Sequence, residues 1–255
     1  MLKTIACFKW VIDEADIKVD AATRKLILDR VGYKINSYDR NAIEEAVRLQ
    51  EQHGGAVAAL TLTQPTAKAC LKDALSRGPD SVYFVNDSAF TGLAPLQTAT
   101  LLAAAIKTGI EYDLIICGEG SSDLYSQQVG PALAEILEIP CITYVNKLSY
   151  SDGQIVADRK LDDGIETVSV KLPALVTILP DINSPRIPTL KQVLGAAKKP
   201  VHNLAIDALG PVCQPCLQTN EILAATMDRK RVKFAADAEG IRSAVGALLR
   251  DGVIS

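Results

Sequence analysis

The chain has 255 residues, with 27 basic and 30 acidic side chains and a formal net charge of −3. Because the charge is small and no block of like charge stands out, nothing indicates a nucleic-acid or anionic-membrane partner. Apolar residues make up 48% of the chain, enough for a large core, but no apolar run reaches the length of a membrane-spanning helix.

The N-terminal stretch MLKTIACFKWVI has neither the long apolar segment nor the small-residue cleavage site of a signal peptide. The six cysteines are scattered, most of them inside apolar runs. This distribution is typical of reduced, buried thiols. We therefore expect a cytoplasmic protein whose first residues form a strand.

The first half of the chain alternates short β-rich runs with amphipathic segments of helical period. A hairpin is expected over 17–20 and 25–29. Strands are expected over 3–8, 56–62, 81–85 and 114–117, and helices follow position 36, over 67–76, over 96–107 and from about 126. Such an alternation predicts a parallel sheet covered by helices on both faces.

After Pro140 the pattern changes to short β runs with little helix between them. These runs cover 141–145, 148–150, 154–159, 166–171 and 175–179, with hairpin turns at 151–153 and 162–164. A short helix is expected over 190–197, an irregular stretch from 201 to about 233, and a last amphipathic helix over 237–250. An irregular stretch of this length suggests an arm laid on a partner. We therefore expect an α/β domain over 1–200 and a C-terminal arm over 201–255.

The stretch LIICGEGSSDLYSQQVGPALA, residues 114–134, is the strongest candidate for a binding loop. A buried strand leads into Gly118 and Gly120, then into serines and an aspartate, then into a helix. This order favours phosphate binding, because backbone N–H groups and the positive end of the helix dipole would face the anion. The spacing matches neither the P-loop nor the dinucleotide fingerprint, so an ordinary strand-to-helix connection is the alternative.

Other polar or turn segments are expected at the same edge of the sheet. They are residues 7–9, 36–39, 62–63 and 118–130. Ligands of parallel sheets bind at the carboxyl ends of the strands. This convergence strengthens the prediction of a nucleotide site.

A catalytic constellation is not evident in the sequence. The two histidines, His53 and His202, belong to no motif, and no Ser-His-Asp spacing or metal-ligand cluster occurs. Cys213 and Cys216 form one CxxC, which suits a redox pair, half of a zinc site or an accidental pair of thiols. A hydrolytic or acid–base enzyme is therefore poorly supported.

Three long segments resemble a known family. LDDGIETVSVKLPALVTILPDINSPRIPTLKQVLGAAKKP, residues 161–200, is similar to the signature region of electron transfer flavoprotein beta subunits. YKINSYDRNAIEEAVRLQE, residues 33–51, and GEGSSDLYSQQVGPALAEIL, residues 118–137, resemble the same family. The forms DLYSQQVG and DINSPRIP are most similar to the Fix-type and carnitine-pathway beta subunits.

The resemblance implies a three-layer α/β/α, Rossmann-like fold and a heterodimer. An alpha subunit would hold the redox-active FAD, and the C-terminal arm of this chain would wrap that subunit. This chain would bind an adenine nucleotide, AMP in most members and a second FAD in the electron-bifurcating ones. It would act as an electron carrier rather than an enzyme, and would dock on an acyl-CoA dehydrogenase or a similar flavin dehydrogenase.

The resemblance also implies roles for particular residues. Arg159 would lie near the flavin of the alpha subunit, and Leu190 would insert into a pocket of the dehydrogenase, although packing within its own subunit is the alternative. Lys160 stands where the family commonly has glutamate, which puts any role of that glutamate in doubt. The nucleotide site would comprise Cys7, Asn36, Ser37, Tyr38, Asp39, Leu62, Thr63, Asp123, Leu124, Tyr125, Ser126, Gln127, Gln128, Val129, Gly130, Pro131, Ala132, Leu133 and Ala134.

Two alternatives to an electron carrier with AMP stay open. The first is a bifurcating, NADH-oxidising subunit with FAD in its own site. The second is a stand-alone nucleotide sensor or ATP-using enzyme. Bifurcating members have a small Gly/Thr/Ala-rich turn where this chain has Leu124 and Tyr125. The bulkier side chains favour AMP.

Overall fold

A computed structural model describes residues 1–64, 68–88, 90, 92–210, 217, 219–225 and 231–254. These residues divide into two compact units. Unit 1 comprises Met1–Lys18 and Ile27–Ile222, and unit 2 comprises Val19–Leu26 and Leu223–Ser255. The CxxC formed by Cys213 and Cys216 lies outside the described residues.

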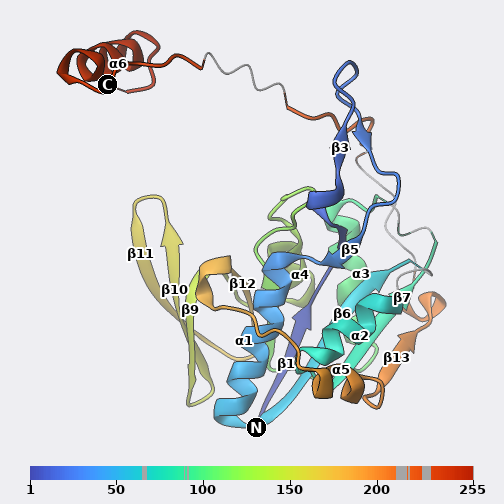
Figure 1. Cartoon of the computed structure of the whole chain (residues 1–255). Coiled ribbons are helices and arrows are strands. Elements are labelled where there is room, and N and C mark those ends of the chain that lie inside the picture. Colours follow the sequence, from blue (N-terminus) through green and yellow to red (C-terminus); the bar gives the residue numbers. More distant parts are fainter. Residues whose placement is uncertain are drawn as a thin grey trace. The chain divides into compact units, whose positions relative to one another are not determined.

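Unit 1 is built on a mixed sheet of nine strands in the order β11-β10-β9-β12-β8-β1-β6-β7-β13 (Figure 1). From β9 to β13 in this order the strands run parallel, and β10 and β11 continue the sheet in antiparallel pairing. The strands are β1 (Leu2–Cys7), β6 (Gly55–Thr63), β7 (Ser81–Asn86), β8 (Leu114–Gly118), β9 (Cys141–Ser151), β10 (Gln154–Leu161), β11 (Gly164–Lys171), β12 (Ala174–Ile178) and β13 (Val201–Leu204).

Helices cover both faces of this sheet (Figure 1). Helices α1 (Ser37–His53), α2 (Lys68–Ser76) and α5 (Leu190–Ala196) pack in one apolar cluster. Helices α3 (Pro95–Lys107) and α4 (Val129–Leu137) pack in the other. Short elements complete the unit: β2 (Trp10–Ile12) paired with β5 (Tyr33–Ile35), and the 3-10 turns η1 (Glu14–Asp16), η2 (Pro180–Ile182) and η3 (Ile206–Leu209).

The central strands are apolar on both sides because both faces are covered. In β8, Ile115 belongs to the α3–α4 cluster, whereas Leu114 and Ile116 belong to the α1–α2 cluster. All three side chains are fully buried. Successive side chains of a strand point to opposite faces, so a continuous apolar run is what a doubly covered strand requires. The expected α/β class, with a mostly parallel sheet between two helical layers, is confirmed.

The β-rich second half differs from expectation at one place. The runs 141–145 and 148–150 form one strand, β9, instead of two. The pairing of β9 with β10 shifts register between Val145 and Lys147, which makes Asn146 the extra residue of a bulge. The bulge explains why the alternation of the sequence breaks there although the strand continues.

The two predicted hairpin turns are present on either side of β10. Asp152 and Gly153 join β9 to β10 with φ of 52° and 75°. Two consecutive left-handed residues are what a type I′ turn requires, and this turn matches the twist of the paired strands. Asp162 and Asp163 join β10 to β11.

The expectation of an irregular chain from 201 onward is wrong at its start. Val201–Leu204 is β13, which pairs in parallel with β7 from Val201 opposite Val82 to Leu204 opposite Val85. The sheet therefore extends beyond the boundary at residue 200 that the sequence suggested. Four residues are too short a run for the alternation of a strand to be recognised in the sequence.

Unit 2 contains a hairpin tip and the last helix. Strands β3 (Lys18–Val19) and β4 (Leu26–Ile27) form the predicted hairpin. Within unit 2, Lys25 forms an isolated antiparallel bridge with Leu223, and the N–H of Ala224 donates to the carbonyl of Arg24 at 2.9 Å. The last helix is α6 (Ala238–Arg250), whose N-cap Asp237 accepts the N–H of Gly240 at 2.7 Å. Among the described residues, no helix is both long and apolar enough to cross a bilayer.

Candidate functional site

The carboxyl ends of β1, β6 and β8 lie next to one another at one edge of the sheet. Cys7 at the end of β1 is in register with Leu60 of β6, and Ala6 is in register with Ile116 of β8. The segments that follow these strands, and the first turn of α1, are the segments that the sequence placed there. Hydrogen bonds between side chains and backbone groups join three of them directly.

Asn36, the residue before α1, connects three segments with one buried side chain. Its Nδ2 donates to the carbonyl of Gly120 at 2.8 Å, and its Oδ1 accepts the N–H of Ser122 at 3.1 Å. Its own N–H donates to the carbonyl of Lys9 at 2.9 Å. Asn36 is fully buried, and each of these polar groups has a partner. The side chain therefore sets the spacing between the loops after β1 and β8.

Asp39 lies in the first turn of α1 and also binds the loop after β1. Its Oδ2 accepts the N–H of Lys9 at 2.7 Å. Burial raises the pKa of Asp39 to about 7, although the N–H groups of Lys9 and Gly118 and the side chain of Asn36 partly offset the effect. A Cβ at Gly118 would lie 2.4 Å from Oδ1 of Asp39, so only glycine fits at this position.

Cys7 is buried beside Cys117 of β8 under this edge. A hydrogen bond with the Cys7 thiol, followed by burial, raises the pKa of Cys117 well above its ordinary value. A raised pKa keeps a cysteine in the unreactive thiol form. The side chains of Cys7 and Cys117 therefore form part of the apolar core beneath the loops.

The loop from Glu119 to Gln128 is longer than predicted, because α4 begins at Val129 and not near Ser126. Tyr125 and Gln127 have φ of 44° and 57°, in the left-handed region, which interrupts a helical path. Glu119 holds both residues: its Oε1 accepts a hydrogen bond from Nε2 of Gln127 and a longer one, at 3.5 Å, from the hydroxyl of Tyr125. The ring of Tyr125 lies 5.5 Å from that of Tyr38.

Glu119 carries a second feature that the sequence did not reveal. Its Oε2 is buried and forms no hydrogen bond with the described part of the chain. Burial raises the pKa of Glu119, and the hydrogen bonds from Gln127 and Tyr125 only partly offset this. Its position between two glycines directly after a buried strand is the one sequence signal that could have identified it.

The N-terminus of α4 faces the same loop. The first amides of a helix have no partner within the helix, and here they belong to Val129 and Gly130, since Pro131 has no N–H. A Cβ at Gly130 would lie 2.3 Å from Cγ2 of Thr177, which shows how closely α4 packs on β12. The glycine therefore lets this helix terminus lie directly against the sheet.

Lys9 brings a positive charge to this loop. Its Nζ donates to Oδ2 of Asp123 at 2.5 Å, and both side chains are partly exposed. Oδ1 of Asp123 accepts hydrogen bonds from the hydroxyl of Ser121 at 2.5 Å and from the N–H of Leu124 at 2.8 Å. Burial favours a raised pKa of Asp123, but Lys9 and Ser121 outweigh it and lower that pKa. The sequence placed Lys9 at this edge, within residues 7–9, but did not single out its charge.

These groups suit a phosphate. A phosphate requires N–H donors and a cation, which the start of α4 and Lys9 offer. Glycines at 118 and 120 let Asp39 and the ring of Tyr125 pack directly against the backbone of the loop. Leu62, Thr63, Ser37, Ser126, Gln128 and Ala132 complete the residues expected at this edge. Leu133 and Ala134 have their side chains in the α3–α4 core, so any contact they make with a ligand is through the backbone.

The remaining candidates belong to β10 and α5. Arg159 of β10 donates from Nε to the carbonyl of Thr143 at 2.9 Å and from Nη1 to Oε2 of Glu166 at 2.9 Å. Lys160 pairs with Asp181 at 3.2 Å. Leu190, the first residue of α5, is 73% exposed, so it does not pack in the core of unit 1.

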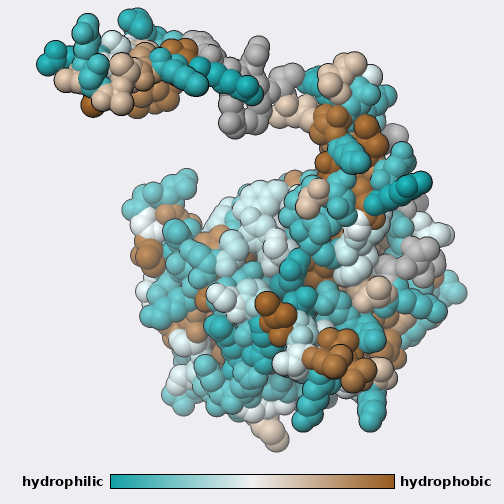
Figure 2. Space-filling model, viewed as in Figure 1, coloured by the Kyte–Doolittle hydropathy of each residue, from teal (hydrophilic) through white to brown (hydrophobic). Residues whose placement is uncertain are grey.

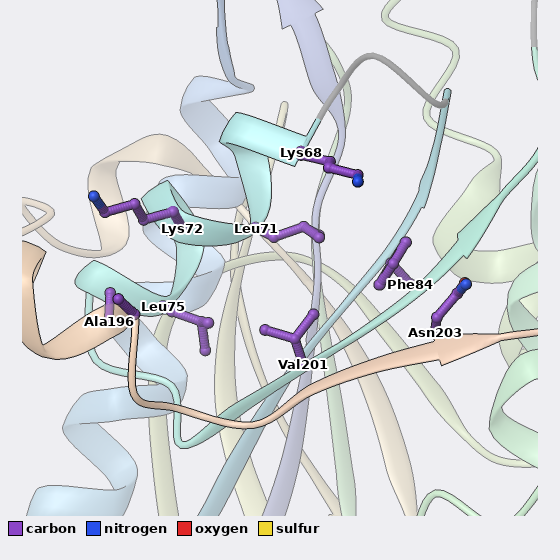
Figure 3. A pocket seen from close by; sticks show the side chains of 9 residues that line it. Lys68, Leu71, Lys72, Leu75, Phe84, Ala196, Val201 and Asn203 are labelled. Carbon is purple, nitrogen blue, oxygen red and sulfur yellow. The ribbon is translucent and has the colours of Figure 1, made fainter.

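A pocket of about 450 Å3 lies elsewhere, between α2, α5, β7 and β13 (Figure 3). Leu71 and Leu75 point from α2 toward Val201, whereas the amine of Lys72 points away from them (Figure 3). None of its lining residues belongs to the candidate site. Among the residues that the structure describes, no group of three or more histidine, cysteine, aspartate or glutamate side chains is placed to hold a metal ion.

The sequence model of the electron transfer flavoprotein domain family matches residues 23–209, more than half of the chain. The chain belongs to this family. The match extends from the hairpin of β3 and β4 to the end of η3, and so includes α1, the β8–α4 loop and the segment around α5. Electron transfer flavoproteins take part in electron transport and bind flavin or AMP, so the loop at the end of β8 belongs to a protein of that role.

Proposed function

We propose that this chain is the beta subunit of a heterodimeric electron transfer flavoprotein, a cytoplasmic carrier that shuttles electrons between flavin dehydrogenases and a redox partner. The observation that carries the proposal is the meeting of the loops after β1 and β8 with the first turns of α1 and α4. In this proposal the loops hold AMP. The FAD of the alpha subunit supplies the redox chemistry, so this chain binds, orients and shields and is not itself an enzyme.

The choice of AMP over FAD rests on the side chains of the loop. A Cβ at Gly120 would lie 2.5 Å from Cδ2 of Tyr125, so that ring packs directly on the glycine backbone. The ring of Tyr38 lies 5.5 Å from that of Tyr125. FAD needs room beyond its adenosine phosphate for a second phosphate and a flavin. Two aromatic rings at the loop leave less of that room than a turn of small residues would.

The alternative is an electron-bifurcating subunit that oxidises NADH at an FAD in the same loop. The helix N-terminus would serve the adenosine phosphate of either nucleotide, so it does not discriminate between them. The packing of Tyr125 is the observation that disfavours this alternative.

The need for an alpha subunit is supported by α6. Its apolar side chains are exposed: Ile241, Val245, Leu248 and Leu249 are 41–62% accessible. An amphipathic helix normally buries such a face. Within the described part of unit 2 nothing covers this face, and we propose that the alpha subunit does. Arg159 near the alpha-subunit flavin and Leu190 as an anchor on an acyl-CoA dehydrogenase complete the proposal.

The test is the nucleotide content of the heterodimer. The complex with the alpha subunit is purified and denatured, and the released nucleotides are quantified. One FAD and one AMP per heterodimer is the expected result. Two FAD would move the protein to the bifurcating class, and no nucleotide beyond one FAD would contradict a nucleotide site in this chain.

A further inference from the structure

The segment from Asn183 to Thr189 has no regular secondary structure, yet it is tied firmly to α1. It joins η2 to α5, whose N-cap is Thr189. A free loop of this length would lose its order readily, because fixing each residue costs conformational entropy. Side chains of α1 offset that cost at two points.

The first tie is an exchange of hydrogen bonds between two asparagines. Nδ2 of Asn41 donates to the carbonyl of Pro180 at 3.0 Å and to the carbonyl of Asn183 at 2.9 Å. In return, Nδ2 of Asn183 donates to the carbonyl of Asn41 at 3.1 Å and to Oε2 of Glu45 at 2.9 Å. Asn41 and Glu45 are both buried. The start of the segment is therefore anchored to the backbone of α1.

The second tie is a double ion pair of Arg186. Its Nε and Nη2 donate to Oε2 and Oε1 of Glu44 at 2.8 and 3.1 Å. Its Nη1 and Nη2 donate to the two oxygens of Glu51 at 2.7 and 3.1 Å. The N–H of Arg186 also donates to Oε2 of Glu44, at 3.0 Å.

Glu44 is the centre of this tie. Its side chain is 5% exposed and also pairs with Arg48. Burial favours a raised pKa of Glu44, but the hydrogen bonds and charge of Arg186 outweigh it and lower that pKa, so the carboxylate stays ionised. A bidentate pair between arginine and a buried carboxylate is among the strongest and most directional polar contacts in proteins. It holds both the side chain and the backbone of residue 186.

The tied segment leads directly to apolar side chains that nothing in unit 1 covers. Ile187 is 91% exposed, Leu190 is 73% exposed and Leu194 is 63% exposed. Figure 2 shows hydrophobic side chains gathered over α5 and the segment that leads into it. All three guanidinium nitrogens of Arg186 donate to Glu44 or Glu51. The surface therefore offers apolar contact beside an arginine that is already neutralised.

We propose that Asn41, Glu44 and Glu51 are positioning residues: through Asn183 and Arg186 they hold Ile187, Leu190 and Leu194 in place for an apolar pocket of a protein partner. The inference rests on the proposed docking role of Leu190. A surface that is ordered before binding avoids the entropy cost of ordering it on the partner. The tie then contributes to affinity without touching the partner.

Hydrogen–deuterium exchange of the full heterodimer tests the tie directly. In Glu44→Gln, amides of residues 183–196 are expected to exchange at least about tenfold faster, because local opening of the segment no longer requires that the ion pair be broken. Glu111→Gln is the matched control, since Glu111 forms an exposed pair with Lys3. Glu44→Gln leaves the half-buried Arg186 without one of its charged partners, which can weaken the whole fold. The double variant Glu44→Gln, Arg186→Met removes both charges of the pair. It still lacks the tie between the segment and α1.

Electron transfer from an acyl-CoA dehydrogenase, reduced by its acyl-CoA, tests the positioning role. The double variant is expected to raise KM for the heterodimer at least about fivefold and to leave kcat within about twofold, because the surface must be ordered on the partner. Unchanged exchange in residues 183–196 would overturn the tie. Faster exchange with an unchanged KM would overturn positioning when Leu190→Ala does raise KM. If Leu190→Ala also leaves KM unchanged, the docking role itself fails and positioning falls with it.

Discussion

At the scale of single residues, the candidate site depends on polar side chains that are buried and satisfied. Asn36 joins the loops after β1 and β8 with its amide, and Asp39 accepts the N–H of Lys9. A buried polar group costs little when its partners are present and about 1–3 kcal/mol when one is lost. Substitutions at these residues should therefore affect the spacing of the loops as well as stability.

The pH dependence of stability tests the environment of Asp39. Its pKa is raised from 3.8 to about 7. The folded chain therefore binds this proton more tightly, and the contribution is present below pH 4 and lost as the pH rises through 7. The loss amounts to at most about 4 kcal/mol. Asp39→Asn cannot titrate, so its stability deficit relative to the wild type should be largest at or below about pH 4 and should shrink as the pH rises to 8.

Urea unfolding of the full chain at several pH values measures this deficit. Asp162→Asn, in an exposed hairpin turn, is the control and should show no such trend. A deficit for Asp39→Asn that stays constant or grows with pH would show that the Asp39 carboxylate is ionised in the folded chain.

At the scale of elements, α1 serves two regions of the surface. Its first turn, with Asp39, lies in the candidate nucleotide site, and its next turns, with Asn41 and Glu44, hold the segment before α5. The chain after α5 is held by Lys199, whose Nζ donates to the carbonyls of Leu75, Gly78 and Pro79 at 3.1, 2.9 and 2.6 Å. Lys199 therefore satisfies carbonyls at the end of α2 and in the turn that follows it.

The exposed start of α5 leads to a prediction about Leu190. Burying one leucine at an interface contributes about 1.5–3 kcal/mol. Leu190→Ala should therefore raise KM for electron transfer from an acyl-CoA dehydrogenase by about tenfold or more, while flavin content and heterodimer stability stay unchanged. Leu96→Ala is the matched control, because Leu96 is 49% exposed on α3, on the opposite face of the sheet. Equal KM values for Leu190→Ala and the wild type would refute the anchor.

At the scale of the whole molecule, the sheet sets where the chain can be cut. β13 pairs with β7, and removing it would expose a long apolar strand edge, which favours aggregation. The boundary at residue 200 is therefore a poor place for truncation. The limit of unit 1 at Ile222 leaves the nine strands intact.

A chain that ends at Ile222 should keep a folded sheet and lose the alpha subunit. The reason is that it lacks α6 with its exposed apolar face, which we propose as a contact with that subunit. Circular dichroism and size-exclusion chromatography with the alpha subunit measure the two properties. Full-affinity pairing of the truncated chain would contradict a role of α6 in the heterodimer.

The sequence by itself determined the α/β class, because covered parallel strands need continuous apolar runs such as 114–117 and helices need their own period. It also determined the edge at which the loops gather, since strand direction follows from the alternation of elements. Local turn chemistry was sufficient for Asp152 and Gly153, because a type I′ turn depends on few neighbouring residues.

Only the tertiary structure decided features that depend on residues far apart in the chain. The start of α4 shifted to Val129 because Glu119 holds Tyr125 and Gln127 in left-handed conformations. Likewise, β13 formed because β7 offered a partner, and Arg186 became a structural tie because α1 places Glu44 beside it, 142 positions away in the sequence. Such contacts leave no local period or propensity in the sequence, so no pattern of neighbouring residues could reveal them.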